Sequence, residues 1–159
     1  MKLALNKEYA RRHLFVTVVM TALGLWFGFD GFIRYPATPA AELYRSIEGS
    51  EAPEGFDLEG FKRQKTQTQY GFTTLSLLAA LVVGLRLYGS YKFNFEFDDA
   101  GFSFNGRKYT YGDIAETDHR LWKTKTILKL RLKDGANVVL DAWHHTGVKE
   151  FEAKLVRTK

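Results

Sequence analysis

The stretch HLFVTVVMTALGLWFGFDGFI, residues His13–Ile33, decides the fold of this chain, and YGFTTLSLLAALVVGLRLY, residues Tyr70–Tyr88, repeats its character. Neither stretch carries a charged residue in its central part. A helix rises about 1.5 Å per residue, so about twenty residues cover the roughly 30 Å hydrocarbon core of a bilayer. We therefore predict two membrane-spanning helices, over residues 14–33 and 70–91.

Basic residues flank both predicted spans. Lys2, Lys7, Arg11 and Arg12 precede the first span, against one acidic residue. The connecting segment 34–69 carries five basic and six acidic residues. Because Lys and Arg are enriched on the cytoplasmic side of membrane proteins, we expect residues 1–13 and the C-terminal part in the cytoplasm and segment 34–69 outside. This topology predicts a multi-pass protein of the cytoplasmic membrane.

A cleavable signal peptide is the alternative interpretation of the first apolar stretch. The chain starts basic, continues apolar, and then offers small residues for cleavage at positions 37–40. The apolar part of a signal peptide usually has about 7–15 residues, whereas this stretch has about twenty. Its length favours a membrane span.

Composition limits the chemistry available to the chain. It has 159 residues, a formal net charge of +5 and no cysteine. Without cysteine there is no disulfide framework, thiolate nucleophile or thiolate metal site. The adjacent His144 and His145 would point to opposite faces of a strand, so they cannot share a metal without further ligands. We predict neither a metal ion nor a cofactor.

Small residues recur at helical spacing in both predicted spans. They are Gly24 and Gly28 in the first span, and Ala80 and Gly84 in the second. Small residues four apart let helix backbones approach closely, so these could pack the two helices together or form a homodimer, although such pairs also arise by chance in apolar sequence. Asp30, the acidic residue in a span, precedes Arg34 by four residues, which predicts an interfacial ion pair.

The connecting segment 34–69 is predicted to be partly helical. Thr38 is placed as an N-cap and Pro39 as the first helical residue, with an end near Gly49. From Asp57 onward a second helical pattern could run directly into the second span. We favour a role of this segment as a solvated connector, and contact with a partner is the alternative.

Residues 92–159 change to alternating aromatic and polar side chains. Phe93, Phe95 and Phe97 alternate with polar residues, and Asn105-Gly106 is a strong hairpin signal. Further strands are predicted over residues 102–104, 108–111, 114–122, 126–133 and 137–143. Thr146 is predicted to cap a final amphipathic helix. The predicted fold class is α+β: a helix hairpin followed by a small antiparallel sheet or partial barrel capped by a C-terminal helix.

The strand order, the segment Tyr111–Ile114 and the ending Leu140–Trp143 before a helix resemble bacterial pleckstrin-homology-like (PH-like) domains, which often follow two membrane spans. The resemblance covers about residues 90–157 and the hairpin. It implies a binding or scaffolding module without catalysis. Eukaryotic relatives that bind phosphoinositides hold phosphates with basic residues around the first hairpin, but the matching loop Asp98–Gly101 is acidic here. The chain also has one strand fewer than the seven-stranded pattern.

A basic stripe is the most prominent surface feature of the predicted domain. Along one face of a predicted strand the odd positions include Lys123, Lys125, Lys129, Arg131 and Lys133. Such a face could dock on anionic lipid. Alternatively, its cations pair with acids of neighbouring strands and are only solvated. Nucleic-acid binding would need aromatic platforms or a groove-reading helix, and the rings are predicted to be in the core. We expect no nucleic-acid partner.

These observations lead to two hypotheses of function. The first is a non-enzymatic, membrane-anchored PH-like scaffold that binds a protein partner or another copy of itself at the cytoplasmic face. The alternative is a domain that docks on anionic membrane lipid through the basic strand face. A transporter or intramembrane enzyme would need polar residues at mid-depth in the spans, where the chain offers only hydroxyl groups.

Overall fold

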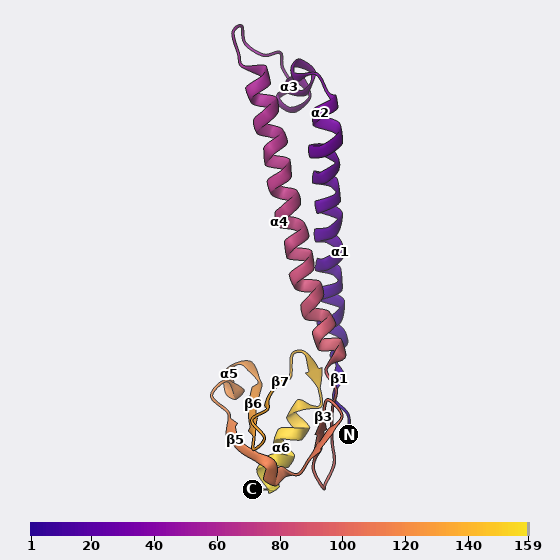
Figure 1. Cartoon of the computed structure of the whole chain (residues 1–159), viewed down its shortest axis with the longest axis vertical. Coiled ribbons are helices and arrows are strands. Elements are labelled where there is room, and N and C mark those ends of the chain that lie inside the picture. The colour runs from indigo at the N-terminus through magenta and orange to yellow at the C-terminus, as the bar shows by residue number, and fades with distance from the viewer. Residues whose placement is uncertain (159) are drawn as a thin grey trace. The chain divides into compact units, whose positions relative to one another are not determined.

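The computed structural model describes residues 1–158 and divides into two compact units (Figure 1). One unit comprises residues 14–85, the larger part of two long helices with the segment that joins them. The other comprises residues 1–13 and the chain from residue 86 onward.

The helical unit is an antiparallel pair with a short helical connection. Its elements are α1 (Lys7–Phe29), the π-helix η1 (Asp30–Arg34), α2 (Tyr35–Ala37), α3 (Ala40–Glu48) and α4 (Leu58–Lys92). The continuous helices Lys7–Ala37 and Leu58–Lys92 are long and apolar enough to span a membrane, and their apolar windows are only 17% buried. A core helix of a soluble protein would be mostly buried, so this exposure favours contact with lipid.

Glycines lie where α1 and α4 approach each other. A Cβ atom added at Gly24 would lie 2.6 Å from Leu77 Cδ2, and one added at Gly28 would lie 3.6 Å from Thr73 Cγ2. On α4, Ala80 is buried and Gly84 faces Thr17. The four small residues noted in the sequence therefore lie in or beside the contact between the helices of one chain.

Enlarging Gly24 should weaken the helix pair. We expect Gly24→Leu to destabilise it by about 1–3 kcal/mol, because the new side chain overlaps Leu77 and forces both out of favourable rotamers. Gly71 on α4 is the matched control, since a Cβ there meets nothing within 4 Å. Thermal unfolding in detergent should show a lower midpoint for Gly24→Leu and an unchanged or higher one for Gly71→Leu. Equal shifts would contradict this packing.

The connection between the long helices has its own small core. Ala40 and Leu43 of α3 are buried, and the rings of Tyr44, Phe56 and Phe61 lie within 5.0–6.1 Å of one another. The predicted helix end at Gly49 is confirmed, with a left-handed φ of 72°. The predicted cap was wrong by one residue. Pro39 occupies the N-cap position, and the Thr38 hydroxyl donates to the Arg34 carbonyl instead.

The second unit contains three small antiparallel sheets and a C-terminal helix, so the predicted α+β class is confirmed, with no closed barrel among residues 1–158. The sheets are β2-β3-β4 (Phe95–Phe97, Phe102–Phe104, Arg107–Tyr109), β5-β6-β7 (Ile114–Asp118, Ile127–Leu132, Asn137–Asp141) and β1-β8 (Ala4–Leu5, His145–Thr146). The helices are η2 (Tyr111–Asp113), α5 (Trp122–Lys125) and α6 (Val148–Thr158).

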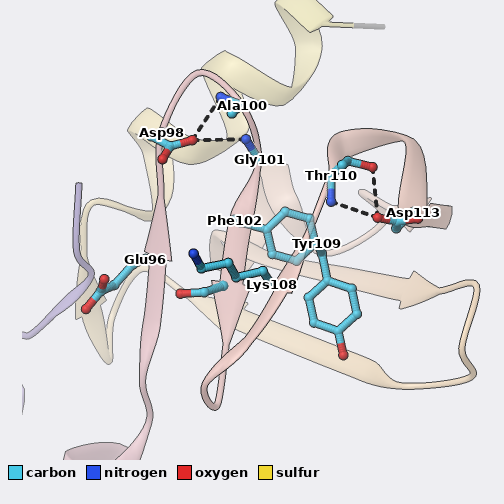
Figure 2. Close-up of a pocket in the computed structure, with 10 residues that line it drawn as sticks. Glu96, Asp98, Ala100, Gly101, Phe102, Lys108, Tyr109, Thr110 and Asp113 are labelled. Carbon is cyan, nitrogen blue, oxygen red and sulfur yellow. Dashed lines mark hydrogen bonds between the residues drawn. The ribbon is translucent and has the colours of Figure 1, made fainter.

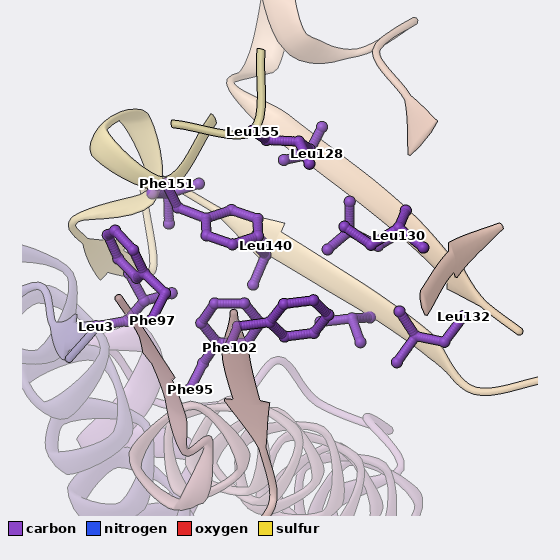
Figure 3. Close-up of a cluster of buried hydrophobic side chains, with 13 residues drawn as sticks. Leu3, Phe95, Phe97, Phe102, Leu128, Leu130, Leu132, Leu140, Phe151 and Leu155 are labelled. Carbon is purple, nitrogen blue, oxygen red and sulfur yellow. The ribbon is translucent and has the colours of Figure 1, made fainter. Parts of the chain in front are cut away.

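The core of this unit lies between the sheets and α6 (Figure 3). The phenylalanines of β2 and β3 contribute one side, and alternate leucines of β6 with Val138 and Leu140 of β7 contribute the other. Phe151 of α6 is fully buried and meets Phe95 and Phe97 edge-on, at ring distances of 4.9 and 5.3 Å. The period-2 aromatic pattern of the sequence therefore marks the core face, as predicted.

An unpredicted strand comes from the N-terminal segment. The Leu3 amide donates to the Phe95 carbonyl at 2.9 Å, and the Phe97 amide donates to the Met1 carbonyl at 2.7 Å. On the other side β1 pairs with β8, with Ala4 opposite Thr146. The segment therefore lies between β2 and β8. Residues before α1 therefore pair with strands that come after α4 in the sequence.

Two predicted elements of the domain differ from the structure. The strand predicted over 114–122 ends at Asp118, and α5 follows, ending where Thr126 adopts a left-handed φ of 53°. Thr146 lies in β8 rather than capping α6, because its hydroxyl donates to the Ala4 carbonyl at 3.2 Å. Thr146 differs because it pairs with a segment distant in sequence, and the strand end differs because of a helical turn before Thr126. The alternation of side chains reveals neither.

Candidate functional site

The predicted basic stripe is not one strand face. Lys129 and Arg131 project from β6, but Lys123 and Lys125 lie on α5, and Lys133 lies in the turn after β6. The prediction of a continuous cationic strand face was therefore wrong for Lys123, Lys125 and Lys133. The helical turn of α5 separates the first pair of lysines from the strand.

The cations of β6 lie opposite acids of β5. Arg131 is in register with Glu116, at 3.9 Å between Nη1 and Oε2, and Lys129 is in register with Asp118. Two hydrogen bonds from Arg120 to the Asp118 carboxylate hold the pKa of Asp118 down at about 2, so it stays ionised. Exposed pairs add little stability, but the acids offset part of the positive charge of the strand face.

A hollow of about 430 Å³ lies on the β2-β3-β4 sheet (Figure 2). Asp98 accepts hydrogen bonds from the amides of Ala100 and Gly101 at 2.8 and 3.0 Å. Asp113 accepts from the amide and hydroxyl of Thr110 at 2.7 and 2.8 Å, and these bonds lower its pKa. These carboxylates are fixed by their own turns. Three acidic residues and one lysine line the hollow, so it is net acidic, unlike a phosphate site.

A buried group of polar and aromatic side chains lies where the ends of the long helices meet the β-domain, all within the second unit. Tyr9 of α1 has an exposed fraction of 0%, and its hydroxyl lies 3.4 Å from the Ser90 hydroxyl of α4. His145 Nε2 lies 3.0 Å from the Ser90 carbonyl oxygen, and Phe93 packs against the same imidazole at 4.7 Å. We call Tyr9, Ser90, Phe93, His144 and His145 the junction.

His144 lies at the edge of the junction among several charged and titratable groups. Its ring is 4.3 Å from Tyr9, and its Nε2 is 3.7 Å from Asp141 Oδ2. Burial is the main cause that lowers the pKa of His144. The Asp141 carboxylate raises this pKa by a smaller amount, and repulsion from His145, Arg86 and His13 lowers it further. The neutral imidazole is therefore the form that fits the junction.

The domain should lose stability as the pH falls through the ordinary histidine range. Because the folded pKa of His144 is lowered from 6.5, the unfolded chain binds the proton more readily, so stability is full above about pH 6.5 and declines toward the lower folded pKa. Replacing His144 by Gln should flatten this decline, whereas His119→Gln, which alters a more exposed histidine paired with Glu152, should not. Chemical unfolding at pH 5 and 7.5 measures both.

The acidic residue of the first span has local partners in the helical unit. Asp30 is buried, and its carboxylate lies 3.2 Å from Trp26 Nε1 and 3.5 Å from Arg34 Nη1. The four-residue pairing predicted from the sequence is present. The π-helix η1 begins at this residue, and Gly31 within it faces Tyr70 of α4.

The junction was not predicted from the sequence. Its members come from α1, α4, β8 and the residues next to α4 and β8, and they are up to 136 residues apart, counted from Tyr9 to His145. One signal was readable: Asn6 is a strong N-cap residue, and its side chain accepts from the Glu8 amide at 2.9 Å, which starts α1 at Lys7. That early start brings Tyr9 onto the helix.

No known protein family, curated protein or solved structure matches this chain. Within the described residues 1–158, no three His, Cys, Asp or Glu side chains converge as metal ligands do. The geometry of the chain's own residues is therefore the basis for inferring its function.

Proposed function

We propose that this protein is a membrane-anchored, PH-like interaction module that acts by binding at the cytoplasmic face of the membrane and not by catalysis. The observation that carries the proposal is the N-terminal segment Met1–Leu5. It precedes the first long helix, yet Met1 and Leu3 bond to β2, and strand β1 within it pairs with β8, in the domain that follows the second. One folded domain thus contains residues from before and after the apolar helix pair, and it can present its surface at the membrane boundary.

Exposed apolar side chains support a membrane location for the helix pair. Leu14, Phe15 and Leu25 of α1 and Leu75 and Val82 of α4 each expose more than half of their surface. In water this exposure would favour aggregation. Cleavage as a signal peptide near Ala40 would also remove β1, and with it the buried Leu3 from the core of the domain.

Small antiparallel sheets covered by a C-terminal helix are the layout that the PH-like part of the proposal needs. Residues 1–158 contain eight strands rather than the six predicted, because the N-terminal segment adds β1 and residues 145–146 add β8. Helix α6 then covers the core through Phe151 and Leu155. The acidic loop of the first hairpin, where Asp99 pairs with Lys154, argues against a phosphoinositide site at that position.

Topology can be tested with single cysteines, since the chain has none of its own. Glu54→Cys lies in the connecting segment and Lys149→Cys on α6, and both positions are exposed. In bacterial spheroplasts, a membrane-impermeant maleimide should label Glu54→Cys directly and Lys149→Cys only after permeabilisation. The opposite pattern would place the domain outside. Recovery of the full chain in the soluble fraction without detergent would refute the membrane anchor.

The interaction itself has a separate test. The full chain, purified in mild detergent from native membranes, should retain a stoichiometric protein partner or form a defined homo-oligomer, which light scattering and mass spectrometry distinguish. Recovery of a pure monomer, also after cross-linking in the membrane, would contradict the interaction half of the proposal.

A further inference from the structure

We propose that one rim of the β-domain, formed by Lys123 and Lys125 of α5 together with Trp143, binds anionic lipid headgroups of the leaflet in which the long helices end. We call these three residues the membrane rim. The inference rests on the proposed function, because it requires α1 and α4 to span the bilayer. It assigns lipid contact to a place other than the strand face that the sequence suggested.

Strand register brings the three residues of the membrane rim to the same end of the β5-β6-β7 sheet. Ile127, at the start of β6, is opposite Asp141 at the end of β7. Beyond this pair the Ala142 amide donates to the Thr126 carbonyl at 3.1 Å. Helix α5 ends directly before Thr126, and Trp143 directly follows Ala142. The α5 lysines and the tryptophan are therefore neighbours across the end of the sheet.

The same end of the sheet contacts the first turns of α1. The Asn6 amide donates to the His144 carbonyl at 2.8 Å, and the Arg12 guanidinium lies 5.4 Å from the Trp143 ring centre. Arg12 stands two residues before Leu14, where the apolar run begins. In a spanning helix this position lies at headgroup level, and Trp143, which is 42% exposed, is the residue type that settles there.

Charge distinguishes the membrane rim from the strand face. Among residues 1–158, Lys123 and Lys125 form no ion pair with a carboxylate, whereas Arg131 pairs with Glu116. Within the same range Lys129 also forms no ion pair, but it is in register with Asp118, which stays ionised. Arg131 is four residues further along β6 than Ile127, about 13 Å at strand spacing, which exceeds the screening length of about 8 Å in physiological salt, so lipid charge at the rim would barely reach Arg131.

Two lysines are enough for docking in this setting. A cation near anionic lipid favours binding by roughly fivefold, so the pair contributes roughly 25-fold. A free domain would bind weakly at that value, but the helices hold the rim beside the bilayer and raise its effective concentration. Exposed Arg11 and Arg86, which also lie at the helix ends, add charge of the same sign.

The test uses the full chain in lipid nanodiscs with one fluorescent cysteine. Thr124→Cys lies between the two lysines and leaves both in place, and Val139→Cys on the outer face of β7 is the control probe. Lipids with a spin label on the headgroup quench fluorescence at the bilayer surface. We expect at least threefold stronger quenching at position 124 than at 139 in discs with anionic lipid, and most of the difference should be lost in 1 M salt or in purely zwitterionic discs.

Charge reversal then identifies the residues responsible. In the Thr124→Cys chain, Lys123→Glu with Lys125→Glu should abolish the anionic-lipid dependence, and Arg131→Glu with Lys133→Glu, which lie further from this end of the sheet, should leave it unchanged. The proposal would be overturned by quenching that does not depend on lipid charge. It would also be overturned if the lipid dependence were lost only with the second charge-reversed pair. A domain that binds protein through this rim would show quenching indifferent to lipid charge. Failure of the chain to enter nanodiscs would instead contradict the proposed function.

Discussion

Replacing Leu3 by aspartate will unfold the β-domain, although Leu3 lies in a segment that precedes the first long helix. Its side chain is only 3% exposed and packs in the core beside Gly147, where a Cβ would lie 2.9 Å from Leu3 Cδ2. Truncating a buried leucine to alanine costs about 2–5 kcal/mol, and a carboxylate without a partner costs more. Because domains of this kind are stable by only about 5–15 kcal/mol, we expect loss of cooperative unfolding in near-UV circular dichroism.

Ala4 provides the matched control for this prediction. It lies on the same strand and faces the other way, exposed, opposite Thr146. Ala4→Asp should therefore keep the domain folded, with a change below about 1 kcal/mol, and Leu3→Ala should lie between the two aspartate variants. If Leu3→Asp and Ala4→Asp unfold alike, Leu3 does not contribute to the core as the structure describes.

This expectation rests on a contact that local sequence patterns could not reveal. Alternation of Phe93, Phe95 and Phe97 predicted a strand because the period of side chains along a strand is fixed locally. Nothing local says which segment pairs with that strand. Met1–Leu5 is too short for a periodic signal, and its partners lie about ninety residues away or more. The sequence therefore indicated a missing strand but not its source.

The candidate site was likewise predictable from the sequence only where it depends on local patterns. The helix-packing glycines could be predicted, since small residues four apart act within a single helix, and Gly24 does face Leu77. The predicted basic stripe assumed one strand through Thr126, but the left-handed conformation of Thr126 ends α5 and breaks the alternation of side chains. A non-glycine residue with positive φ gives little warning in sequence, so Lys123 and Lys125 were assigned to the wrong element.

Truncating Tyr9 will release the helix ends from the β-domain. The side chain is fully buried in the junction, with its ring 3.9 Å from His13 and 4.3 Å from His144. Removing a buried aromatic ring costs about 3–5 kcal/mol, so Tyr9→Ala should lower the unfolding midpoint of the domain markedly. Hydrogen exchange should also rise at the amides near Ser90 and in β8, because both segments lose the group they pack against.

Two variants separate the ring from the hydroxyl and from general effects of losing a tyrosine. Tyr9→Phe keeps the ring and loses only the 3.4 Å contact with the Ser90 hydroxyl, so it should cost no more than about 0.5–1.5 kcal/mol. Tyr88→Ala removes a ring that is 60% exposed and should leave the domain midpoint nearly unchanged. A Tyr9→Phe variant as unstable as Tyr9→Ala would place the stabilising effect in the hydroxyl network.

Since the membrane rim contacts α1 through the same turn that carries His144, Tyr9→Ala should also weaken the anionic-lipid dependence of the quenching at position 124, even though it changes no charge.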